Sequence, residues 1–164
     1  MGQPIYKNLT VKNFTSQANG QMAPAEGDGQ YPFGYFRYVY DFAVHGGAIS
    51  TITLAAQSGV AANTLPAGAV VVNAVIDVIT ILTSGGSATV ALQLEAANDI
   101  FTATAYSSEP FEATGVEILT PVFATDTTWI KTTAARAPKI VIGTAALTAG
   151  KFYVYLFYFQ SSTL

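Results

Sequence analysis

The residues of this chain that could do chemistry are few and separated. Its single histidine, His45, stands before Gly46 and Gly47 at the end of a predicted strand, with no nucleophile or orienting acid near it in the sequence. A catalytic histidine needs such partners, and a histidine metal cluster needs more histidines. We therefore interpret His45 as a turn residue. The chain has no cysteine, which excludes disulfides, thiolate metal sites and cysteine nucleophiles.

Carboxylates are the other candidates for chemistry. Two groups lie close together in the sequence, Glu95 with Asp99 and Glu109 with Glu112 and Glu117. Paired carboxylates can hydrolyse glycosides or bind Ca²⁺. The segment most similar to a calcium loop, Glu26-Gly27-Asp28, supplies only half of a ligand set. We interpret all of these carboxylates as solvated loop residues, and we expect no enzyme activity and no metal.

Composition predicts a protein that covers its surface with other chains. Charged residues are 10% of the chain, where about 25% is usual for a globular domain. Apolar residues are 51%, and there are ten Phe and nine Tyr. A free monomer of this composition would expose apolar surface, so we expect an oligomer or a component of an assembly.

Several classes of partner are not expected. The net charge is −3 and the seven basic residues are scattered, whereas nucleic-acid binding needs a basic stripe. The start, MGQPIYKN, does not resemble a secretory signal, and the apolar run Val70–Leu82 is too short to cross a membrane. Gly46-Gly47 and Gly85-Gly86 match no phosphate-binding motif. We therefore expect no nucleic acid, membrane, cofactor or small-molecule substrate.

The most informative elements lie between Leu65 and Glu95. A β-rich run, Val70–Leu82, is followed by a Ser-Gly-Gly turn and by Ser87–Glu95, which alternates strictly between apolar and polar residues. A period of two is typical of a strand with one face on a core. The apolar positions of the second run are Ala88, Val90, Leu92 and Leu94. We predict that the two runs form a hairpin around Ser84-Gly85-Gly86.

The remaining runs also predict strands and no helix of ten residues or more. The run Phe36–Val44 alternates, with Phe36, Tyr38, Tyr40, Phe42 and Val44 on one face. Further strands are expected at Ile49–Leu54, Ile100–Ala105, Thr128–Thr133, Lys139–Gly143 and Phe152–Gln160, with loops at Ala55–Gly68 and 106–127. About eight strands with turns between most of them predict an all-β domain over residues 35–164. Its expected form is a jelly-roll-like β-sandwich.

Residues 1–34 predict an extended N-terminal arm with at most one short strand, Leu9–Phe14. Glycine, proline, Asn and Gln interrupt it without a sustained period. Its apolar residues are too many for a freely solvated linker, so we expect the arm to lie on its own domain, a neighbour or a larger scaffold. The candidate contact residues are Ile5, Tyr6, Leu9, Val11 and Phe14.

The run Phe152–Gln160 has apolar residues on both faces, which predicts a strand covered on both sides. One of its faces is a candidate subunit interface, formed by Tyr153, Tyr155, Phe157 and Phe159. The alternative for this strand is an ordinary core within one chain. Trp129 and the tyrosines could instead form a platform for sugar rings, although aromatic side chains more often anchor a core or an interface.

Two segments carry a resemblance to a known family. DFAVHGGAISTITL (Asp41–Leu54) and LPAGAVVVNAVIDVITILTSGGSATVALQLEAANDI (Leu65–Ile100) cover about a third of the chain. They resemble the head decoration, or cement, proteins of tailed bacteriophages. The shared pattern is F-x-V-x-x-G, a strand, L-P-A-G-A-V-I, a strand, TSGGSATV and a strand.

The resemblance implies a non-enzymatic virion protein with a jelly-roll-like fold. Such a protein would bind the outside of the phage head as a homotrimer, contact the major capsid protein and stabilise the shell. Two alternatives remain open. One is a receptor- or carbohydrate-binding β-sandwich of a phage tail or fibre, and the other is a small hydrolase on a β-sandwich.

Overall fold

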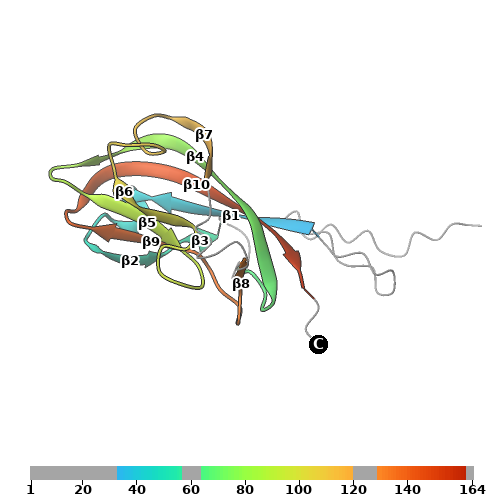
Figure 1. The fold of residues 1–164 in the computed structure, drawn as a ribbon. Coiled ribbons are helices and arrows are strands. Elements are labelled where there is room, and N and C mark those ends of the chain that lie inside the picture. The colour runs from blue at the N-terminus through green and yellow to red at the C-terminus, as the bar shows by residue number, and fades with distance from the viewer. Residues whose placement is uncertain (1–32, 57–63, 120–128, 162–164) are drawn as a thin grey trace, which may run out of the picture.

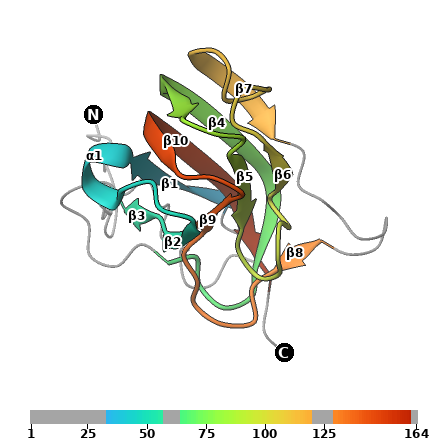
Figure 2. The same ribbon diagram turned by 90° about the vertical axis from the view of Figure 1, so that its left-hand side faces the viewer.

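The computed structural model describes residues 33–56, 64–119 and 129–161, which form two antiparallel β-sheets packed face to face (Figures 1 and 2). Sheet A contains β1 (Phe33–Asp41), β3 (Ala55–Ala56), β4 (Ala69–Ser84), β7 (Gly115–Leu119), β8 (Ile130–Lys131) and β10 (Leu147–Gln160). Sheet B contains β2 (Ser50–Thr53), β5 (Thr89–Gln93), β6 (Phe101–Ala105) and β9 (Lys139–Gly143). The prediction of an all-β sandwich is confirmed.

The strand order is that of a jelly roll. Apart from the two-residue strands β3 and β8, the order is β1-β10-β4-β7 in sheet A and β2-β9-β5-β6 in sheet B. The strand pairs are therefore nested along the chain: β1 pairs with β10, β2 with β9, β4 with β7 and β5 with β6, so each pair encloses the next in sequence. Eight strands wound in this way make the double Greek key of the jelly roll.

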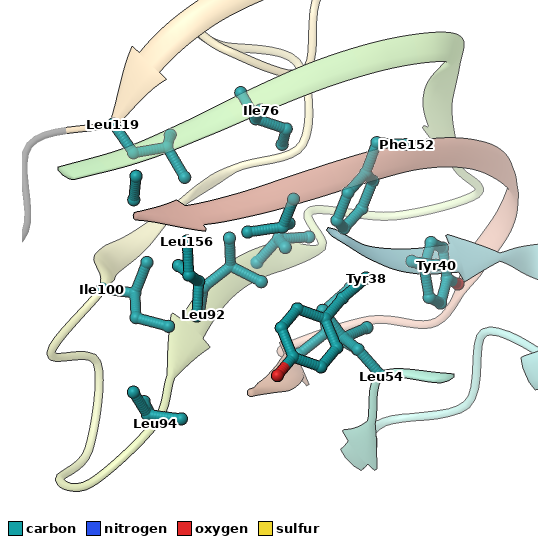
Figure 3. Packing of buried hydrophobic residues seen from close by; sticks show 14 of the residues in the cluster. Tyr38, Tyr40, Leu54, Ile76, Leu92, Leu94, Ile100, Leu119, Phe152 and Leu156 are labelled. Carbon is teal, nitrogen blue, oxygen red and sulfur yellow. The ribbon is translucent and has the colours of Figure 1, made fainter. Parts of the chain in front are cut away.

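The core lies between the two sheets, where alternate residues of each strand meet (Figure 3). Tyr38, Tyr40 and Phe152 of sheet A are fully buried, as are Leu92 and Ile140 of sheet B. The rings of Tyr40 and Phe152 stack with centroids 5.2 Å apart. The hydroxyl of Tyr40 donates to the carbonyl of Gly46 at 2.8 Å, and burial raises the pKa of Tyr40 to about 12. The buried hydroxyl of Tyr40 is thus held neutral and hydrogen-bonded.

The first strand ends earlier in the sequence than the alternation predicts. β1 ends at Asp41, and the next four residues form the short helix α1 (Phe42–His45). The Asp41 carboxylate accepts from the backbone N–H of Ala43 at 3.0 Å, which caps this turn of helix. The prediction that the strand continues through Phe42 and Val44 is wrong: Phe42 packs against the core from α1, and Val44 is 76% exposed.

The predicted hairpin between the two central runs is also wrong. β4 pairs with β10, β7 and β8 in sheet A, whereas β5 pairs with β6 and β9 in sheet B. The Ser-Gly-Gly segment therefore crosses from one sheet to the other. The predicted burial of Ala88, Val90, Leu92 and Leu94 is confirmed, since none is more than 4% exposed. The buried residues of the two runs meet across the sandwich instead of lying side by side.

The structure also contains two short strands where the sequence predicts loops. β7 lies within the predicted loop 106–127 and pairs with β4 from Ala74↔Leu119 to Val78↔Gly115. β3 lies at the start of the predicted loop Ala55–Gly68 and pairs with β1. Both strands are at sheet edges, where short pairing leaves little periodic signal. The last strand, β10, begins at Leu147, five residues before the predicted start.

Gly150 is where β10 needs a residue without a side chain. Its φ is +141°, and an added Cβ would lie 2.1 Å from Cδ2 of the buried Leu82. We expect Gly150→Ala to destabilise the protein by about 2 kcal/mol or more, because it adds backbone strain and overpacking. Urea unfolding measures this. Gly85→Ala is the matched control, since no atom lies within 4 Å of its added Cβ. Equal stability of the two variants would contradict the assignment.

Candidate interaction surface

The structure gives His45 a structural role. Its Nδ1 lies 3.0 Å from both the backbone nitrogen and the backbone oxygen of Asp41. Its ring stacks on Tyr40 with centroids 5.9 Å apart. These contacts hold the end of β1 against α1, in keeping with the interpretation of His45 as a turn residue.

The carboxylates of Glu95 and Asp99 also hold local structure. Asp99 accepts the backbone N–H groups of Leu94 at 2.7 Å and of Glu95 and Ala96 at 2.9 Å, which closes the turn between β5 and β6. Glu95 accepts from the Thr133 hydroxyl at 2.5 Å and pairs with Arg136 at 2.5 Å. Burial raises the pKa of Glu95, but the hydrogen bonds from Thr133 and Arg136 outweigh this and lower it. These contacts join the turn to the segment between β8 and β9.

The other carboxylates do not converge. Glu109 and Glu112 are exposed and Glu117 is half-buried at the sheet edge. Within the described ranges, no three His, Cys, Asp or Glu side chains are placed to hold a metal ion. Glu26 and Asp28 lie outside those ranges. No helix in the described part of the chain has the length and apolarity needed to span a membrane.

The surface that stands out is the outer side of sheet A, away from sheet B. Strand register places both residues of every second pair there, for example Tyr35↔Phe157, Arg37↔Tyr155 and Val39↔Tyr153. We call this surface the outer aromatic face. Its residues are Phe33, Tyr35, Arg37, Val39, Val75, Asp77, Val116, Ile118, Tyr153, Tyr155, Phe157 and Phe159.

The aromatic rings of this face contact one another along β1 and β10. Tyr35 lies 5.8 Å from Phe157 and 6.4 Å from Tyr155, measured between ring centroids. Phe33 meets Phe159 edge to face at 6.1 Å. These separations fall in the favourable range for aromatic pairs. The rings thus form a strip of two contacting groups along β1 and β10, Tyr35 with Tyr155 and Phe157, and Phe33 with Phe159.

Large apolar side chains of this face are open to water in the single chain. Phe157 is 37% exposed, Tyr35 41%, Val116 68% and Ile118 72%. On β10 the inner residues Phe152, Val154, Leu156 and Tyr158 are buried. The inner side of this strand is thus covered by sheet B, while on its outer side Tyr153, Tyr155 and Phe159 are half-buried and Phe157 is exposed.

The outer side of sheet B is different. Register places mostly small or polar residues there, namely Thr51, Thr53, Thr89, Ala91, Gln93 and Lys139, with Val141 as the one larger apolar residue among the paired positions. Such residues are typical of a solvated sheet face. The sandwich therefore has one polar outer face and one aromatic outer face, and only the second is a candidate interaction surface.

The structure extends the candidate interface beyond the four predicted residues of β10. Tyr35 and Val39 join it from β1, and Val116 and Ile118 join it from β7. The alternation of Val116 and Ile118 was the only signal for the second pair, and it sits among Gly, Thr and Glu residues. The arm candidates Ile5, Tyr6, Leu9, Val11 and Phe14 lie outside the described residues. Trp129, the sugar-platform candidate, is 54% exposed just before β8.

The fold and this surface define a jelly-roll β-sandwich with one aromatic outer face. Solved structures with a similar fold come from phage capsids. A chain of the cyanophage Pam1 capsid asymmetric unit has a TM-score of 0.54 and 16% identity, covering 90% of this chain and 99% of that one. A chain of the acid-stable capsid of Helicobacter pylori bacteriophage KHP30 has a TM-score of 0.52 and 13% identity, covering 80% and 90%.

A chain of the Ralstonia phage GP4 capsid has a TM-score of 0.52 and 22% identity, covering 87% of this chain and 92% of that one. Identities this low show a shared fold. No protein-family model and no curated protein matches the sequence. The likeness spans the sandwich as a whole, so it concerns the architecture and not one shared motif.

The margin of the outer aromatic face carries an ion pair that predicts an acid response. Asp41 and Lys151 face each other across β1 and β10, with Oδ2 and Nζ 2.9 Å apart. The hydrogen bond from Lys151 lowers the pKa of Asp41. A lowered carboxyl pKa contributes stability above the unfolded value of about 4, and that contribution is lost as pH falls through the folded value.

We therefore expect Asp41→Asn to narrow the gap in melting temperature between pH 7 and pH 3. Thermal unfolding of both proteins across that range measures it, and Glu112→Gln is the control, since Glu112 is exposed and takes part in neither ion pair of the described chain. If Asp41→Asn and wild type lost stability in parallel on acidification, the pair would not contribute.

Proposed function

We propose that this protein is a non-enzymatic structural protein of a phage virion. In this proposal it is a capsid decoration, or cement, protein that binds the outside of the head as a homotrimer. The observation that carries the proposal is the jelly-roll fold, shared over 80% or more of the chain with chains of three phage capsid structures. The resemblance of Asp41–Leu54 and Leu65–Ile100 to decoration proteins supports it independently.

The chemistry of the described residues supports the same proposal. His45, Glu95 and Asp99 are engaged in local contacts, and the charged groups of the described ranges form no metal cluster. The feature that remains without a structural role inside the chain is the outer aromatic face. A surface of this kind is suited to a protein partner.

The mechanism of such a protein is thermodynamic. A ligand that binds the assembled shell and not its dissociated subunits stabilises the shell by mass action. A symmetric trimer brings three equivalent contacts to the shell, and the second and third bind at a high effective concentration. Weak individual contacts with the major capsid protein would then suffice to hold adjacent subunits together.

Within this proposal, two parts of the chain have separate roles. The arm residues Ile5, Tyr6, Leu9, Val11 and Phe14 contact the major capsid protein or a neighbouring trimer. The outer aromatic face, with Tyr153, Tyr155, Phe157 and Phe159 at its centre, is the interface between subunits. This division separates assembly of the trimer from attachment to the shell, so each can be tested by itself.

A sugar-binding module of a tail or fibre is the alternative, and exposed aromatic residues such as Trp129 favour it. Aromatic faces stack on sugar rings as well as on protein. Binding of the full-length protein to a glycan array, lost in Trp129→Ala, would support this alternative. Attachment to heads without glycan binding would support the decoration role.

The oligomeric state is the first expected outcome. Light scattering after size exclusion, over a dilution series, should give a mass near three times 17.2 kDa. The expectation follows from the composition and from the exposed aromatic strip, which water solvates poorly. A protein that stays at 17.2 kDa at every concentration would contradict trimerisation in solution.

The role of the arm gives a second expected outcome. A variant lacking residues 1–30 should keep the β-sheet circular dichroism spectrum and the trimer mass, but should no longer sediment with heads assembled from the major capsid protein of the same phage. The full-length variant with Tyr6→Ser and Leu9→Ser should weaken co-sedimentation by at least about tenfold, since apolar anchors dominate such contacts. Normal decoration by the truncated protein would sink the arm hypothesis.

A further inference from the structure

Two opposite charges stand inside the outer aromatic face, and neither has an ion-pair partner there. Arg37 is on β1, and its guanidinium carbon lies 5.0 Å from the ring centroid of Tyr153. Asp77 is on β4, directly opposite Tyr153 in the strand register. The salt bridges of the described chain, Asp41 with Lys151 and Glu95 with Arg136, leave both residues out.

Arg37 and Asp77 lie on opposite sides of β10. β10 separates β1 from β4 in sheet A, so their backbones are two strand spacings apart, about 10 Å across the sheet. Tyr153 and Tyr155 of β10 stand between them. The face therefore carries a cation on one flank, an aromatic strip in the middle and an anion on the other flank.

We infer that a second copy of this chain covers the outer aromatic face, and that Arg37 of one copy pairs with Asp77 of the next. This inference rests on the proposed trimer and names the charges that set its register. A partner that buried this face would leave both charges buried without an ion-pair partner, unless it brought an opposite charge to each. Burial of an unpaired charge is costly. A second copy brings both, in the right number, because it is the same surface.

The arrangement of the flanks fits a cyclic trimer. In a ring the interface is heterologous, so one flank of each subunit meets the other flank of the next. The β1 flank with Arg37 then meets the β4 flank with Asp77 at each of the three interfaces. The β10 rings of Tyr153, Tyr155 and Phe157 face the three-fold axis, where water is excluded.

Val116 and Ile118 support the same geometry. They extend the β4 flank outward, because β7 pairs with β4 through Val75↔Ile118 and Asp77↔Val116. Both are more than two-thirds exposed in the single chain. Asp77 thus lies between the apolar residues of β7 and the tyrosines of β10, and a pair formed there would be shielded from salt.

Charge reversal in the full-length protein tests the inference. The variants are Arg37→Asp, Asp77→Arg and the double variant with both changes. The trimer mass is measured by light scattering over a dilution series, and thermal melting checks that each variant is folded. Each single reversal places like charges at every interface, so we expect dissociation at a concentration at least about tenfold higher than for wild type.

The double reversal should restore the trimer to within about threefold of wild type, because the pair is reformed with its polarity exchanged. The control is Lys151→Gln, which removes a charge from the same sheet face whose partner, Asp41, lies within the chain, and which leaves the Asp41 cap of α1 in place. It should leave the trimer unchanged. If a single reversal fails to fold, the neutral variants Arg37→Gln and Asp77→Asn replace it, with a smaller loss of affinity expected.

Three results would overturn the inference. They are single variants that trimerise as wild type does, a double variant no better than the singles, and a wild type that remains monomeric at all concentrations. Co-sedimentation with heads separates these from failure of the proposed function. If the wild type binds heads but both single reversals leave the trimer mass unchanged, the charge pairing is wrong and the decoration role is not affected. If the single reversals weaken the trimer and the double reversal restores it, but the protein does not bind heads, only the decoration role is wrong.

Discussion

The alternation of side chains along β10 is the constraint on which the rest of the structure depends. β10 lies between β1 and β4 and is the longest-paired strand of sheet A. Because a strand presents successive residues to opposite sides, burying Phe152, Val154 and Leu156 against sheet B places the residues between them on the outside. The chain has put aromatic residues in both sets. The inner set makes the core, and the outer set makes a surface that the monomer does not cover.

The same constraint explains why the sandwich is unequal. Sheet B alternates apolar with small and polar residues, so its outer side is compatible with water, whereas sheet A is apolar on both sides around β10. A continuous sheet cannot turn an aromatic strip inward without exposing the residues that now form the core. Charged residues are therefore scarce on the outer side of sheet A. The two charges within the strip, Arg37 and Asp77, lie on its two flanks.

The sequence was sufficient for the type of fold and for individual strands with clear alternation, such as Val90 and Leu92 of β5. It was not sufficient for pairing. A period of two says which residues are buried but not against which sheet, so the link after Ser84 was predicted as a hairpin when it crosses the sandwich. β7 was not predicted, because an edge strand of five residues can pair with its neighbour without a regular alternation of apolar and polar residues. For the same reason, the sequence indicated the aromatic residues of β10 as an interface but not Val116 and Ile118, which reach that face only through pairing with β4.

The nesting of the strands also orders events in time. β1 is synthesised first in the described chain, but its main partner, β10, follows more than a hundred residues later, with every strand of sheet B between them. Contacts so distant in sequence close slowly, and here they cannot close at all on a nascent chain until Leu147–Gln160 has left the ribosome. Sheet A and its outer face are thus completed together. A chain cut short before β10 lacks the central strand of sheet A together with Tyr153 and Tyr155, so an incomplete translation product cannot form the outer aromatic face.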